Sequence, residues 1–128
     1  MQLNRFMLIR PGDMVVIDFG TSTMRSRAMG RHPAFVVSVD NPRATGSHMM
    51  VIPAFHNASY DDRASDVLLK KNICSGLRHE MYVNASNLQR VDRNRIIRKI
   101  GHVNGGEVMK DVKKCIMRKV GETDEQKG

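Results

Sequence analysis

GRHPAFVVSVD, residues 30–40, joins a basic turn to a run of branched apolar residues. Short runs of this kind, bounded by glycine and proline, are typical of strands that are buried in a sheet. Pro33 opens the run, a position where its missing N–H costs no hydrogen bond of the sheet. The stretch therefore predicts a buried strand at 34–39, with Arg31 and His32 at its entrance.

Similar runs on both sides predict more strands. MVVIDF at 14–19 follows the turn RPGD, and MMVIPAF at 49–55 contains a proline that indicates an edge or a bulge. Weaker candidates lie at 67–69, 81–83, 87–91 and 98–103. These elements predict a small, strongly twisted antiparallel sheet or barrel, in which the first three strands pair with one another.

The last part of the chain has the pattern of a helix. Apolar residues recur with helical spacing from Val108 to Val120, and Asn104 with Glu107 resembles a capping box. The polar residues from about 121 onward predict a frayed tail. With 128 residues, the chain is expected to form a single β-rich α+β domain over 1–128.

The charge of the chain indicates a polyanionic partner. Lysine and arginine number 21 against 13 acidic residues, which gives a net charge of +8. Such a surface attracts nucleic acid, and it attracts an acidic protein equally well. No apolar run approaches the roughly 18 residues that cross a membrane, so we expect a cytoplasmic protein without a membrane contact.

Three basic residues at predicted strand ends form a candidate catalytic site. Acid–base cleavage of a phosphodiester, the backbone of any nucleic acid that this charge attracts, needs a base, an acid and a cation for the negative charge that develops. His32 and His56 supply proton-transfer groups and Arg31 supplies the cation. They come together if the second and third strands pair. Solvated surface residues are the alternative interpretation.

The order of the motifs resembles a known family. RPGDMVVIDFG, GRHPAFVVSVDN, MVIPAF, SNLQRVDRNRIIRKIGHV and a terminal helix follow one another as in the MazF/PemK toxins. This resemblance implies an SH3-like antiparallel barrel with a C-terminal helix, usually dimeric, that cuts single-stranded RNA without a metal or another cofactor. It also implies a cognate antitoxin as partner, and RNA contacts at Arg25, Ser26, Arg27, Gln89 and Arg90.

Two positions depart from the family pattern. The resemblance places the catalytic arginine at His32 and the catalytic threonine at Phe55. Two functions therefore stay open from the sequence. The first is an endoribonuclease toxin with a rearranged site, and the second is an inactive barrel that binds RNA or an acidic protein.

Overall fold

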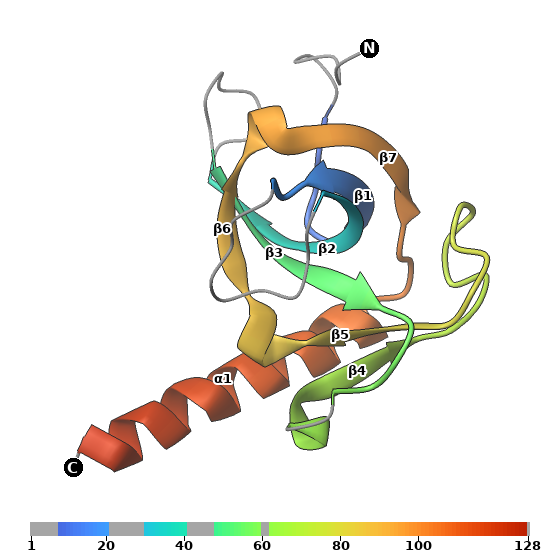
Figure 1. The fold of residues 1–128 in the computed structure, drawn as a ribbon. Helices are drawn as coiled ribbons and strands as arrows, with labels where there is room; N and C mark the ends of the chain where they lie inside the picture. Colours follow the sequence, from blue (N-terminus) through green and yellow to red (C-terminus); the bar gives the residue numbers. More distant parts are fainter. Residues whose placement is uncertain (1–7, 21–29, 41–47, 60–61, 128) are drawn as a thin grey trace.

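Seven antiparallel strands and one C-terminal α-helix make up the described part of the chain (Figure 1). The computed structural model describes residues 8–20, 30–40, 48–59 and 62–127, with side chains up to 121. The strands are β1 (Asp13–Asp18), β2 (Arg31–Val39), β3 (His48–Phe55), β4 (Asp66–Leu69), β5 (Met81–Asn84), β6 (Gln89–Asp92) and β7 (Ile96–His102). Single 3₁₀ turns are η1 (Arg63–Ser65), η2 (Ala85–Asn87) and η3 (Arg93–Arg95), and the helix is α1 (Glu107–Lys127).

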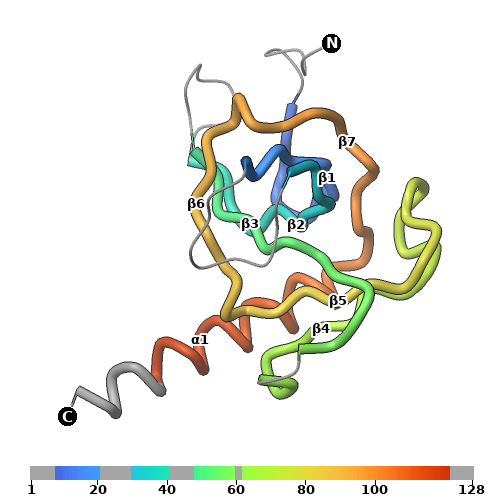
Figure 2. Tube along the Cα trace, in the orientation of Figure 1, coloured from blue at the N-terminus to red at the C-terminus, as the bar shows by residue number. Residues whose placement is uncertain are grey.

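The sheet curls into the expected barrel-like fold. β2 pairs antiparallel with β1 and with β3, as predicted, and β7 pairs with the other edge of β1. The outer edge of β3 is divided, because β6 pairs with its first half and β5 with its end. The turn η3 joins β6 directly to β7, so the chain itself spans the gap between the two barrel edges (Figure 2).

Two apolar clusters lie on opposite faces of β1, β2 and β3. One is enclosed by the barrel strands and contains Ile17, Ala34 and Val51. The other lies between the sheet and the layer formed by α1, β4 and β5, and it contains Met14 and Phe35. Successive side chains of a strand point to opposite faces, so neighbouring residues belong to different clusters.

A buried carboxylate fixes the start of β1 to β7. Asp13 is fully buried and accepts hydrogen bonds from the Arg10 backbone N–H at 2.8 Å and from His102 Nδ1 at 2.7 Å. Lys99 Nζ lies 3.1 Å from the same carboxylate. Since a buried charge is tolerated only with such partners, His102 has a structural role here.

The helix starts later and ends later than the sequence predicts. Gly105 and Gly106 have φ of 92° and 77°, outside the helical region, so α1 begins at Glu107 and Asn104 is not its cap. The Gly106 carbonyl accepts the first helical hydrogen bond, from the Lys110 N–H. α1 then continues to Lys127, through the segment expected to be a frayed tail. Neither it nor any other helix of the described residues is both long and apolar enough to cross a membrane.

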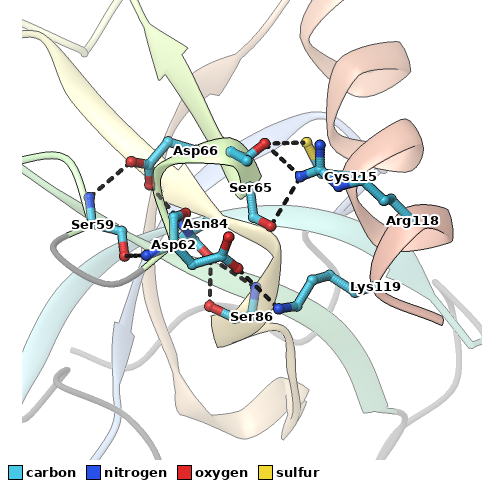
Figure 3. Close-up of polar contacts among 10 residues, drawn as sticks. Ser59, Asp62, Ser65, Asp66, Asn84, Ser86, Cys115, Arg118 and Lys119 are labelled. Carbon is cyan, nitrogen blue, oxygen red and sulfur yellow. Dashed lines mark hydrogen bonds and ion pairs between the residues drawn. The ribbon is translucent and has the colours of Figure 1, made fainter. Parts of the chain in front are cut away.

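Polar side chains attach α1 to the segment before β4 (Figure 3). Lys119 Nζ lies 2.9 Å from Asp62 Oδ2, and Arg118 donates to the Ala64 carbonyl and to Ser65 Oγ. The hydrogen bond from Lys119, helped by Ser65, holds the pKa of Asp62 below its ordinary value of 3.8. We call this group, Asp62, Ser65, Arg118 and Lys119, the helix clamp.

Candidate functional site

The His32 ring contacts two aromatic rings, those of Phe19 and Phe55, at one end of the barrel. Its ring centroid is 6.4 Å from that of Phe19 and 4.8 Å from that of Phe55. His32 Nε2 is 2.6 Å from the Ala54 carbonyl oxygen, so this nitrogen is the protonated one and donates a hydrogen bond to that oxygen. The side chain thus joins the ends of β1, β2 and β3.

Arg31 points away from His32. β2 begins at Arg31, earlier than predicted, so both residues belong to the strand and their side chains face opposite sides of it. Arg31 is exposed, stands opposite Asp18 in the β1–β2 pair, and shares its face with Pro33. The structure therefore separates the two neighbours that the sequence placed in one site.

His56 follows the end of β3 and lines a cavity of about 470 Å³ on the Pro33 face of the sheet. Four basic side chains line this cavity, and we call it the His56 pocket. The basic residues are His56, Arg78, His79 and Arg98, around the apolar residues Val16, Pro33, Leu77, Met81 and Ile100. The His56 and His79 rings lie edge to face, with centroids 6.0 Å apart.

A second groove is lined by two of the predicted RNA contacts, Gln89 and Arg90. Gln89 and Arg90 begin β6 and line a groove of about 310 Å³ together with Phe19, His48 and Arg95. Arg90 Nη2 lies 3.3 Å from Asp40 Oδ2, with both side chains more than half exposed, so this pair adds little to stability. Phe19, which lines this groove, also lies beside the His32 ring. Arg25, Ser26 and Arg27 lie outside the described residues.

The structure thus divides the predicted site between two faces. Arg31 and His56 lie on the face of the His56 pocket, while His32, Gln89 and Arg90 lie toward the barrel end. Sequence reasoning missed Arg78, His79 and Arg98, which no motif connects with His56. The described residues contain no group of three or more His, Cys, Asp or Glu side chains that could hold a metal ion.

The fold is similar to solved toxin structures. MazF (Form-I) from Deinococcus radiodurans superposes with a TM-score of 0.68 and 22% identity, over 90% of this chain and 98% of that chain. The MazE–MazF complex (Form-II) from the same organism gives 0.65 and 21%, over 90% and 97%. A mycobacterial endoribonuclease in complex with its cognate antitoxin gives 0.63 and 18%, over 88% and 95%.

Curated proteins show no significant match to the chain. The family model does match, and it describes the PemK-like, MazF-like toxins of type II toxin–antitoxin systems. The match runs over residues 10–120, from the turn before β1 to the last part of α1. On this match, together with the similar fold, the chain belongs to the PemK-like, MazF-like toxin family.

Proposed function

We propose that this toxin is a metal-independent endoribonuclease that cleaves single-stranded RNA, with His56 and Arg31 at the reacting phosphate. One observation carries the proposal. His56 is exposed in a basic cavity that it shares with Pro33, and Arg31 is the next residue along β2 on that same face. A proton-transfer group and a guanidinium therefore lie on the same face of two neighbouring strands, where both are open to solvent.

The reaction needs no other group from the chain. His56 takes the proton of the 2′-hydroxyl, whose oxygen attacks the adjacent phosphorus. Arg31 donates to the phosphorane oxygens, and the bond to the 5′-oxygen breaks as that oxygen takes a proton from water. The products are a 2′,3′-cyclic phosphate and a 5′-hydroxyl. His32 donates a hydrogen bond to the Ala54 carbonyl, and in this proposal it positions the end of β3 just before His56.

Single-turnover cleavage of mixed single-stranded RNA in excess EDTA tests this function. We expect His56→Asn to lower the rate by roughly 10²-fold or more. Arg31→Gln is expected to lower the rate by an amount that corresponds to about 3 kcal/mol of transition-state stabilisation. Asn57→Ala and Arg63→Gln are exposed controls that keep the wild-type rate. A wild-type rate in His56→Asn would contradict the assignment.

A binding function is the second candidate. The two positions where the resemblance places catalytic arginine and threonine hold His32 and Phe55, whose rings pack together. A packed aromatic pair favours a barrel that binds RNA, or an acidic protein, without cutting it. Wild-type protein that binds single-stranded RNA but leaves it intact in the same assay would establish this candidate.

The proposal includes the partners of a type II toxin. The net charge of +8 suits both an RNA strand and the acidic segment of a cognate antitoxin. Structures of similar fold include a MazE–MazF complex and an endoribonuclease with its cognate antitoxin. We extend these partners to this chain, together with a homodimeric state and a place in the cytoplasm, where its RNA substrate is found.

A further inference from the structure

The far wall of the His56 pocket is a hydrogen-bonded turn. The segment between β4 and β5 carries its own hydrogen bonds, from the Asn72 N–H to the Leu77 carbonyl and from the Leu77 N–H to the Cys74 carbonyl. It packs directly on β7, because a Cβ atom added at Gly76 would lie 2.5 Å from the Ile100 carbonyl oxygen. Figure 1 shows this segment beside β7. The chain's own contacts therefore hold this wall of the pocket against β7.

The charged side chains that line this pocket are all basic among the described residues. Arg78, His79 and Arg98 are exposed around it, and none of the described residues that line it is acidic. None of these three side chains takes part in an ion pair within the described residues. Guanidinium groups arranged in this way attract phosphate, which they can bind through two donors at once.

The floor of the pocket is apolar. Val16 lies between Pro33 and Arg98 in the paired rows of β2, β1 and β7, so these three side chains stand side by side on one face. Leu77 and Met81 close the floor from the other wall. An inorganic anion would leave this apolar surface in water. A ligand that carries both a flat apolar ring and a phosphate covers it, and about 470 Å³ lies within the size range of small-molecule pockets.

We propose that the His56 pocket binds the nucleotide next to the scissile phosphate of the RNA, with Arg78 and Arg98 on its phosphate and the base against Leu77 and Met81. This inference rests on the proposed function, because His56 is the residue where the pocket meets the reacting phosphate. The pocket lies on the opposite face of β2 from His32 and from the groove at Gln89. RNA bound in it therefore passes over the Arg31 side of the barrel.

RNA affinity in the absence of cleavage tests the assignment. The probe is a single-stranded oligonucleotide with 2′-O-methyl groups, which removes the attacking hydroxyl, and binding is followed by fluorescence anisotropy at several salt concentrations. We expect Arg78→Gln and Arg98→Gln each to raise Kd roughly tenfold. Each also lowers the slope of log K against log salt by about 0.7, the value for one phosphate contact on a single strand.

Arg63→Gln is the matched control, because Arg63 is exposed in η1 and loses the same charge without lining the pocket. It is expected to change Kd less than twofold. Equal affinities and equal salt slopes for the Arg63, Arg78 and Arg98 variants would overturn the inference. If the wild type does not cleave RNA, that result counts against the proposed function. The binding assay stays valid in that case, because its probe cannot be cleaved.

Ring resonances of the histidines locate the ligand directly. Titration of wild-type protein with a ribonucleoside 5′-monophosphate is expected to shift the NMR signals of His56 and His79 and to leave His102 unchanged. A shift at His48 alone would place the nucleotide in the groove at Gln89 and overturn the inference. A response of His56 and His79 to a glutamate-rich peptide, without a response to the nucleotide, would assign the pocket to an acidic protein and also overturn it.

Discussion

His32 connects three strand ends through one side chain. The sequence marks it as unusual, because a basic residue stands at the entrance of a buried strand. The direction of its side chain depends on where pairing with β1 begins, and that pairing reaches back to Arg31. Because the sequence predicts the strand only from residue 34, it leaves both residues in the turn, where the alternation of a strand does not apply, so it could name the pair but could not place its members on opposite sides.

Replacement of His32 measures how much this side chain contributes to the free energy of unfolding. His32→Ala removes the hydrogen bond to Ala54 and leaves a space between Phe19 and Phe55. We expect the free energy of unfolding to fall by about 2–4 kcal/mol, the sum of one lost half-buried hydrogen bond and a cavity. Urea unfolding measures this. His48→Ala, at another half-buried histidine, is the control and should cost less than about 1 kcal/mol.

At the scale of elements, the turn between β4 and β5 does the most to shape the site. Its sequence has glycine and polar residues, which predict a loop but not its contact partner. The contact with Ile100 of β7 joins segments that are more than twenty residues apart, and it leaves no local pattern. Strands, by contrast, could be predicted closely, because their apolar runs and turns are local features.

Gly76 is required by this close contact. Gly76→Ala places a methyl group against the Ile100 backbone, so either the turn or β7 must move, and we expect a loss of about 1–3 kcal/mol in unfolding free energy. Gly121→Ala is the matched control. A Cβ atom at this position in α1 meets nothing within 4 Å, and alanine favours a helix over glycine by up to about 1 kcal/mol. The same substitution should therefore destabilise at one site and stabilise at the other, and equal effects would contradict this packing.

The helix clamp predicts a pH dependence of stability. Asp62 has a lowered pKa in the folded protein, so its charged form with Lys119 stabilises the fold above the ordinary value of 3.8. This contribution disappears as the pH falls through the lower, folded-state pKa. We expect Asp62→Asn to be less stable than wild type near neutral pH and to approach it in acid, as followed by urea unfolding between pH 6 and 2.5. A constant difference across that range would exclude the ion pair as the cause.

For the whole molecule, charge and fold could be predicted from the sequence, and the arrangement of the site could not. Apolar runs of the right length predict a curled sheet, and the ordered motifs indicate the family. The His56 pocket draws Val16, Pro33, His56, Arg78 and Arg98 from separate segments. Only the three-dimensional path of the sheet brings these residues together, so no spacing in the sequence could reveal them.

The pairing of β1 with β7 also sets an order of events at the ribosome. Asp13 and His102 are 89 residues apart, and synthesis adds about 5–20 residues per second, so β1 waits on the order of ten seconds for its partner. Arg98 arrives with β7 and completes the pocket only then. A nascent chain that cleaves RNA as proposed therefore lacks a complete His56 pocket until β7 has been synthesised.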